Sequence, residues 1–139
     1  MAISSAICNT FKGELLEGKH NFASGGGHTF KIALYTSSAN LGASTTAYST
    51  SNEITNTSGT AYTAGGATLT SVTPTTSGTS AICDFADVSY TSASFTANGA
   101  LIYNDSQSDK AVAVIAFGGD KTVASGTFTI QFPTADASN

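Results

Sequence analysis

The chain has 139 residues, a formal net charge of −4 and charged side chains at only 10% of its positions, and its length predicts one domain, 1–139. All five basic residues are Lys and they do not cluster, so we expect no nucleic-acid partner. The start lacks the basic and apolar regions of a signal peptide and no apolar run could cross a bilayer, so we expect no membrane partner and a cytoplasmic origin.

The first segment has the spacing of an amphipathic helix. Apolar side chains recur at every fourth position, with one more beside the last: Ile3, Ile7, Phe11, Leu15 and Leu16. This N-terminal stripe predicts a helix over 3–18. Ser4 or Ser5 is suited to cap its start, and Gly18 is well placed just past its end.

The N-terminal stripe has two interpretations. The helix packs on its own sheet, or it forms an amphipathic arm that docks on a neighbouring subunit. We take the stripe as the candidate subunit-contact surface and leave the choice open between packing within one chain and packing between chains.

A Gly-rich joint follows at 19–28. His20 and His28 flank three consecutive Gly residues, but no Cys or carboxylate lies close enough in sequence to complete a metal site, since structural zinc needs four ligands. The Gly run leads into a strand and lacks the Lys-Ser or Lys-Thr of a phosphate-binding loop. We therefore interpret both histidines as solvated loop residues and expect no metal and no cofactor.

Residues 29–36 alternate between apolar and polar positions and predict a half-buried strand. The next thirty residues, 37–66, are mostly small and polar, with four larger side chains: Leu41, Tyr48, Ile54 and Tyr62. Long connections without regular structure are unusual in compact domains and tend to be functional. We expect this long loop to lie on the outside of the fold, held by its four anchors.

The remaining chain predicts further strands at 67–72, ended by Pro74, and at 79–85, 88–90 and 126–133, with a turn at 118–120. Between them, the apolar runs 99–103 and 111–117 flank a polar loop and predict a hairpin. A strand that is apolar on both faces must be covered on both, so this hairpin should occupy the middle of the fold.

Seven or eight short strands with turn signals between them indicate an all-β fold. We expect an antiparallel, jelly-roll-like β-sandwich over 29–133, with one N-terminal helix and a tail at 134–139. The 22 Thr and 19 Ser fit this class, because Thr favours strands and Ser favours turns.

No catalytic constellation stands out, and we expect no enzyme. There is no Gly-x-Ser-x-Gly elbow.

Cys8 and Cys83 are too distant in sequence to indicate a disulfide framework, so we expect idle or buried thiols. Asp84 and Asp87 are interpreted as solvated or edge residues instead of a carboxylate pair. Three acids in turns leave a calcium site as a further alternative: Asp105, Asp109 and Asp120.

Six segments resemble a family of small structural proteins of tailed bacteriophages: FKGELLEGKHNF, FKIALYTSSANLGASTTAYSTSNEI, AYTAGG, GALIYN, KAVAVIAFGGDK and GTFTIQFP. The resemblance covers nearly the whole chain in the same order, and it brings no catalytic or metal-binding residue. It implies a virion protein made in the host cytoplasm.

Within the virion, we expect a capsid decoration or cement protein that stabilises the assembled head. It would act as a homotrimer bound to the major capsid protein or to other virion subunits. Two alternatives remain: a tail, collar or fibre component that exposes the long loop for recognition, and a carbohydrate-binding module or glycan-directed hydrolase.

Overall fold

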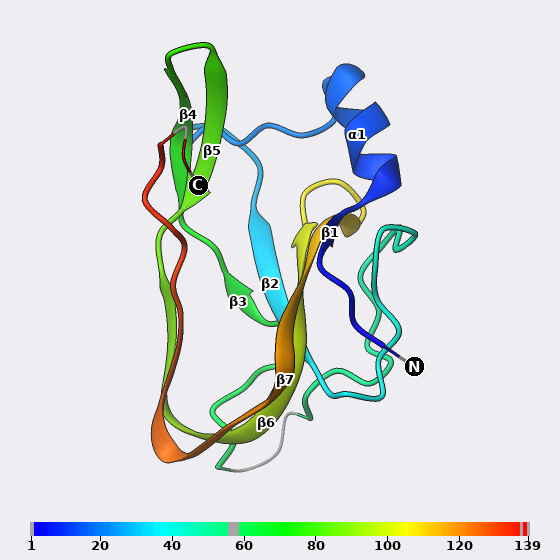
Figure 1. Ribbon diagram of the computed structural model, residues 1–139, viewed down its shortest axis with the longest axis vertical. Coiled ribbons are helices and arrows are strands. Elements are labelled where there is room, and N and C mark those ends of the chain that lie inside the picture. Colours follow the sequence, from blue (N-terminus) through cyan, green and yellow to red (C-terminus); the bar gives the residue numbers. More distant parts are fainter. Residues whose placement is uncertain (1, 56–58, 137, 139) are drawn as a thin grey trace.

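The structure, a computed structural model, describes residues 2–55, 59–136 and 138. Its larger sheet is antiparallel, in the order β1–β7–β6–β2–β3 (Figure 1). The strands of this sheet are β1 (Ala6–Ile7), β2 (Phe30–Tyr35), β3 (Ala67–Thr68), β6 (Val88–Asn104) and β7 (Lys110–Ile130). A second sheet pairs β4 (Ser71–Ser77) with β5 (Ser80–Phe85), and α1 spans Asn9–Leu16. The predicted all-β antiparallel sandwich with one helix is confirmed.

The predicted central hairpin is the joined ends of β6 and β7. Val88 pairs with Ile130 at one end of the two strands, and Asn104 pairs with Lys110 at the other. The last five residues of β6, 100–104, are all buried in succession. Consecutive burial means that both faces are covered, as the apolar run predicted.

The hairpin bends sharply, because one strand carries extra residues. Asn98 lies between the pairs Ala97↔Lys121 and Gly99↔Ala116, so residues 117–120 form a bulge opposite it. We predicted a turn here and ended the strand. That was wrong, because Gly118 and Gly119 adopt φ of 76° and 147°, which bends a strand without terminating it.

The bend makes one hairpin serve two layers. In Figure 1, β6 and β7 descend through the centre, curve at the bottom of the view and rise on the other side toward β4 and β5. The strands predicted separately at 88–90 and 126–133 are therefore parts of β6 and β7.

Pro74 does not end its strand. β4 continues through it, with a change of register between the pairs Val72↔Asp84 and Thr75↔Ile82. A bulge in a two-stranded sheet tolerates Pro, because the missing N–H is not needed for the ladder there.

The helix is shorter than predicted and begins at Asn9, not at residue 3. Ile3 forms an isolated bridge with Leu41, and Ala6 and Ile7 pair with β7. Tertiary pairing thus overrides the helical spacing of the first residues. The N-cap is Cys8, which makes no side-chain capping bond, so neither predicted serine caps the helix.

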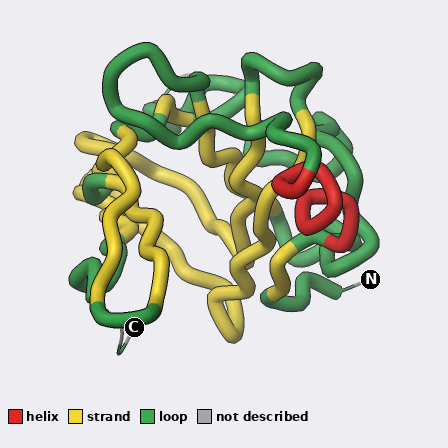
Figure 2. The backbone as a smooth tube through the Cα atoms, turned by 90° about the horizontal axis from the view of Figure 1, so that it is seen from above, coloured by secondary structure: helices red, strands yellow, loops and turns green. Residues whose placement is uncertain are grey.

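The helix ends at Leu16, short of the predicted end at residue 18, and Gly18 lies just past the end as predicted. Gly18 has a φ of 71°, and the Lys19 N–H donates to the Glu14 carbonyl at 2.9 Å while the Gly18 N–H donates to Leu15 at 3.1 Å. This pair of bonds is the Schellman arrangement, which favours Gly in the left-handed position. Figure 2 shows the helix on the outer side of the strands.

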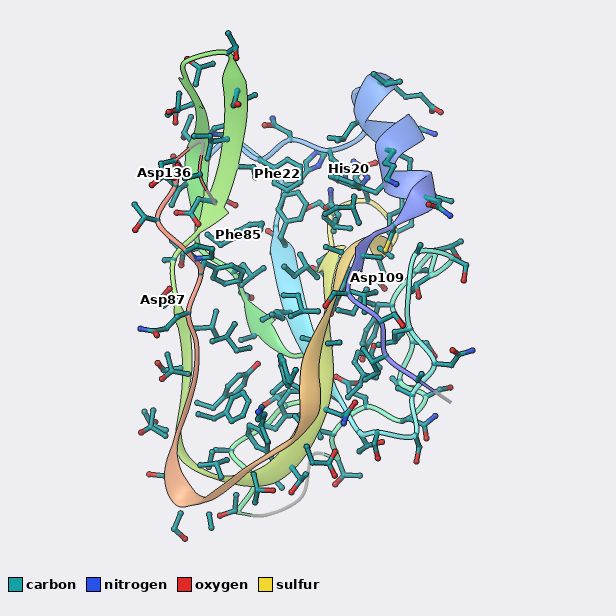
Figure 3. All side chains as sticks on the ribbon, in the orientation of Figure 1. His20, Phe22, Phe85, Asp87, Asp109 and Asp136 are labelled. Carbon is teal, nitrogen blue, oxygen red and sulfur yellow. The ribbon has the colours of Figure 1, made fainter. Side chains whose placement is uncertain are left out.

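An aromatic chain joins the helix to the β4–β5 hairpin. Phe11 of α1 lies 4.8 Å from the His20 ring, Phe22 stacks on Phe30 at 4.3 Å, and Phe22 lies 6.1 Å from Phe85, measured between ring centroids. Figure 3 shows His20, Phe22 and Phe85 in the space between these elements. The joint at 19–28 is therefore packed against the core through its aromatic side chains.

Gly66 provides a test of the packing of the long loop on β2. A Cβ at Gly66 would lie 1.9 Å from the Ile32 carbonyl oxygen, whereas a Cβ at Gly118 would meet nothing within 4 Å. Both residues have a similar positive φ, 81° and 76°. Gly118→Ala should lower the free energy of unfolding by only about 1–2 kcal/mol, which is the strain of an alanine in the left-handed backbone conformation.

Gly66→Ala should lower the free energy of unfolding clearly more, because the backbone must also move. Urea denaturation of the two variants measures the difference. Equal losses would show that the loop does not approach β2 this closely.

Candidate functional site

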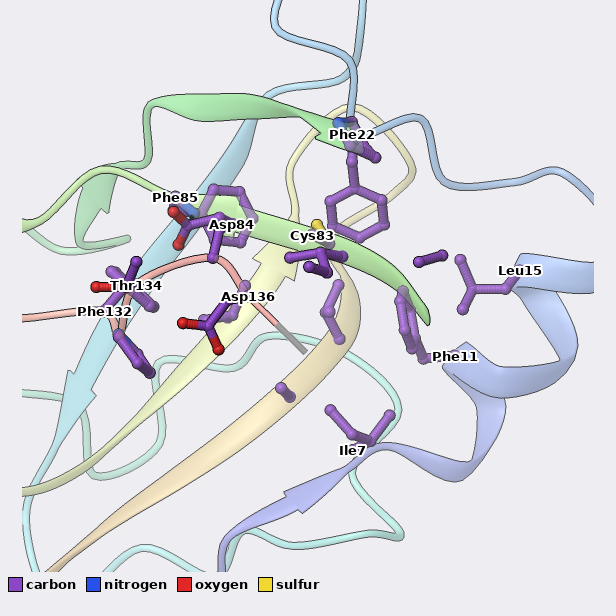
Figure 4. Close-up of a pocket in the computed structure, with 18 residues that line it drawn as sticks. Ile7, Phe11, Leu15, Phe22, Cys83, Asp84, Phe85, Phe132, Thr134 and Asp136 are labelled. Atoms are coloured by element: carbon purple, nitrogen blue, oxygen red, sulfur yellow. Dashed lines mark hydrogen bonds between the residues drawn. The ribbon is translucent and has the colours of Figure 1, made fainter. Parts of the chain in front are cut away.

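An apolar groove lies between α1 and the β4–β5 hairpin, with a volume of about 450 Å³. Its lining is mostly apolar, and the side chains that define it are Ile7, Phe11, Leu15, Phe22, Ile82, Cys83, Phe85, Ile102, Val112 and Phe132. Figure 4 shows Phe11 and Leu15 on one side, and Cys83, Asp84 and Asp136 across from them. The groove has the size and lining typical of a binding cleft.

The rim of the groove exposes apolar side chains. Ile7 is 50% exposed and Leu15 is 44% exposed, and both line the groove, while the neighbouring Leu16 is 92% exposed. Single exposed apolar residues are ordinary. A group of them beside an apolar groove indicates a contact surface.

The N-terminal stripe is therefore divided by the fold. Phe11 is buried within its own chain, and Ile3 packs near Gly99, where an added Cβ would lie 2.7 Å from the Ile3 side chain. Ile7, Leu15 and Leu16 stay open to solvent. Part of the stripe thus packs in its own chain, and part stays exposed beside the groove.

Two charged side chains, Asp84 and Asp136, are among the described residues that line the groove, and both are acidic. The Cys83 side chain is exposed, but partial desolvation by the atoms packed around it, with the charge of Asp84, raises the pKa of its thiol to about 11. The thiol therefore stays protonated at neutral pH and is a weak nucleophile. Cys8 is buried, and both cysteines are free.

A buried carboxylate fastens the long loop to the sheet. Glu53 is only 7% exposed. Its Oε1 accepts hydrogen bonds from the Tyr62 hydroxyl at 2.6 Å and the Gly65 N–H at 2.7 Å, and its Oε2 accepts one from the Tyr48 hydroxyl at 2.7 Å. The Tyr62 oxygen accepts from the Leu34 N–H of β2 at 2.9 Å. The loop is thus tied directly to β2.

Two further tyrosines hold the same loop from the sheet side. The Tyr103 hydroxyl donates to the Gly65 carbonyl at 2.6 Å, and the Tyr35 hydroxyl donates to the Ser49 carbonyl at 2.7 Å. Tyr48 stacks on Tyr103 with centroids 4.6 Å apart. The four predicted anchors are confirmed as packed residues: Leu41 and Tyr48 are half-buried, and Ile54 and Tyr62 are buried.

Glu53 holds this cluster together, and the sequence did not reveal it. It is one acid among nine, and its role depends on phenols that approach from two separate segments. The one available signal was an isolated acid in a loop with Tyr at positions 48 and 62.

The outer side of the loop forms a polar depression of about 350 Å³. Most of its described lining consists of hydroxyl and carboxamide side chains: Ser38, Asn40, Ser44, Thr45, Thr46, Ser49, Ser51 and Asn52. None of these groups is charged. Such a surface offers hydrogen bonds to an uncharged polar ligand.

The interpretation of both histidines as solvated loop residues was wrong for His20. It is 8% exposed, and its Nε2 lies 2.7 Å from Glu14 Oε2. Its Nδ1 lies 3.0 Å from the Asn104 amide nitrogen. Because that amide can only donate, His20 carries its proton on Nε2 and donates it to Glu14.

Asn104 also bonds His28, which is half-buried. The amide nitrogen lies 3.0 Å from His28 Nδ1, and the Asn21 N–H donates to the same ring atom at 3.2 Å. Both ring nitrogens of His20 are occupied, so it has none left to activate a hydroxyl nucleophile. This cluster joins the helix, the Gly-rich joint and the β6–β7 turn.

Among the described residues, the acidic side chains do not assemble into a metal site. Asp87 accepts from the Phe132 N–H at 2.8 Å, Asp105 pairs with Lys31 at 3.3 Å, and Asp120 accepts from the Asn98 amide at 2.9 Å. Across the part of the chain that the structure describes, no group of three or more His, Cys, Asp or Glu side chains is arranged to hold a metal ion.

The comparisons with family models, curated proteins and solved structures gave no match. In residues 2–55, 59–136 and 138, no helix has the length and apolar character needed to span a membrane.

Substitution of Glu53 tests the fastening of the long loop. Glu53→Leu leaves the Tyr62 hydroxyl and the Gly65 N–H without their acceptor, and each such donor costs about 1–3 kcal/mol. We expect the free energy of unfolding to fall by about 3 kcal/mol. Tyr48→Phe removes one half-exposed donor and should cost about 1 kcal/mol. Chemical denaturation and proteolysis of the loop measure both effects, and equal losses would contradict the central role of Glu53.

The buried tyrosines predict a loss of stability in alkali. Burial raises the pKa of Tyr90 to about 12, and burial also raises the pKa of Tyr35, Tyr48, Tyr62 and Tyr103. An unfolded chain releases its phenol protons near pH 10. The contribution of these tyrosines to the free energy of unfolding is therefore fully present below about pH 10. It falls as the pH rises from there toward their pKa values in the folded protein.

Each tyrosine that stays protonated in the folded state contributes a slope of about 1.4 kcal/mol per pH unit. Urea denaturation at increasing pH, with tyrosinate absorbance as a second signal, measures this slope. Tyr90→Phe should reduce it by the share of one tyrosine. A slope near zero above pH 10 would show that the phenols are open to solvent.

Proposed function

We propose that this chain is a non-catalytic structural protein of a tailed bacteriophage particle, and within the particle a decoration or cement protein that stabilises the assembled head. The observation that carries the proposal is the apolar groove beside the exposed Ile7, Leu15 and Leu16. The resemblance of six segments to virion proteins supports the same role.

A binding role also fits the chemistry of the described side chains. His20 is committed to Glu14 and Asn104, and the pKa of the Cys83 thiol is raised. The groove therefore offers apolar area and two carboxylates, with no activated nucleophile. Such a surface acts through affinity, and affinity for an assembled state is what a cement protein needs.

The mechanism is mass action. A protein that binds the assembled shell and not its separated subunits stabilises the shell by an amount that grows with its concentration. A small domain with a fastened loop and a preformed groove loses little conformational freedom when it binds, which favours affinity. The partner on the particle is the major capsid protein or another virion subunit.

The polar depression on the long loop favours a second candidate, a tail, collar or fibre component. Its uncharged hydroxyl and amide lining suits contact with a receptor glycan, which is also the surface that a carbohydrate-binding module would use. Labelling of the protein on intact particles separates the candidates, because copies over the whole shell exclude a tail component.

Particles that lack this protein should release their DNA at a lower temperature, and adding the purified protein should restore the heat-release profile. Leu15→Asp places a charge in the groove wall and should prevent this restoration. Thr127→Asp is the matched control, because Thr127 is exposed on β7 and does not line the groove. If particles that lack the protein release their DNA at the same temperature as complete particles, the cement role is wrong.

A further inference from the structure

Among the described residues, one face of α1 is left exposed. The inner face carries Phe11 and Glu14, both buried. Lys12 and Leu16 are exposed and lie four residues apart, which places them on one side of the helix. An added Cβ at Gly13, the residue after Lys12, would meet nothing within 4 Å. This outer helix face, Lys12 with Leu16, combines one cation with a leucine that is 92% exposed.

The groove has the complementary chemistry. Its interior is apolar, its two charged lining residues are Asp84 and Asp136, and no Lys lines it among the described residues. Its volume of about 450 Å³ accommodates side chains the size of leucine. A suitable occupant therefore presents an apolar side chain next to a positive charge.

The outer helix face does not fill the groove of its own chain. Leu15 lines that groove, and successive helical residues are turned by about 100°. Leu16 therefore points away from the groove that Leu15 lines. Only a second copy can bring Leu16 into it.

We propose that the outer helix face of one copy docks in the groove of a second copy, with Leu16 in the apolar interior and Lys12 beside Asp84. Charge and apolar character match on the two surfaces. Each copy has one helix face and one groove, so two copies can exchange helix faces about a two-fold axis, or successive copies can dock head-to-tail and form a closed ring. The inference goes beyond the virion role and does not depend on it.

A charge swap tests this interface in the purified full chain. The wild type should form an oligomer of defined size by sedimentation equilibrium. Lys12→Glu and Asp84→Lys should each weaken self-association at least tenfold, because each places like charges together, and the double variant should recover most of the loss. Leu16→Glu should give monomers. Lys121→Glu, the same charge change on an exposed residue of β7, should leave the oligomer intact.

Urea denaturation at low protein concentration controls for folding. If Lys12 and Asp84 paired within one chain, the swaps would change the stability of the monomer and not its association, which would overturn the proposal. A wild type that stays monomeric would also overturn it, as would an oligomer that survives Leu16→Glu.

The two proposals can fail separately. A monomer whose binding to particles is lost in Leu15→Asp would mean that another virion subunit occupies the groove, which overturns the self-association and keeps the virion role. An oligomer that obeys the charge swap but never binds particles would support the self-association and remove the cement role.

Discussion

The pairing of β6 with β7 is the constraint on which the rest of the structure depends. The ladder is continuous from Val88↔Ile130 to Asn104↔Lys110 except at its bulges, so one hairpin contributes to both layers. The bulge opposite Asn98 turns the pair without ending it. The β4–β5 hairpin leads directly into one limb, and α1 contacts β7 in the other. The groove between them exists because the two limbs are held apart by a shared bend.

Polar contacts between distant segments position the parts of the chain that lack regular structure. Glu53 gathers three donors in the long loop, and Asn104 joins His20 to His28 across 84 and 76 residues of sequence. Buried polar groups of this kind are costly when unpaired and specific when paired. They give the loop and the joint one defined position, although neither segment has enough apolar residues for a core of its own.

Much of the fold could be predicted from local pattern. Alternation located β2, the apolar runs located the central hairpin, and Gly18 marked the end of the helix. The failures share one cause, which is that long-range contacts decide between local alternatives. The helical spacing of Ile3 and Ile7 gave way to pairing with other segments, and His20 became buried because Asn104 and Glu14 approach it. For the candidate site, the sequence indicated the apolar residues of the stripe, but it could not indicate the opposite wall of the groove, which β5 and the segment after β7 supply.

The contact between Asn104 and the two histidines has a consequence for the order of folding. Asn104 reaches the joint only when β6 has paired with β2, and β1 needs β7 as its template. We therefore expect the N-terminal segment, although synthesised first, to be the last part to settle. A nascent chain would keep the helix that carries Leu15 and Leu16 unplaced until the C-terminal half has emerged and paired, so the apolar groove would form only late in folding.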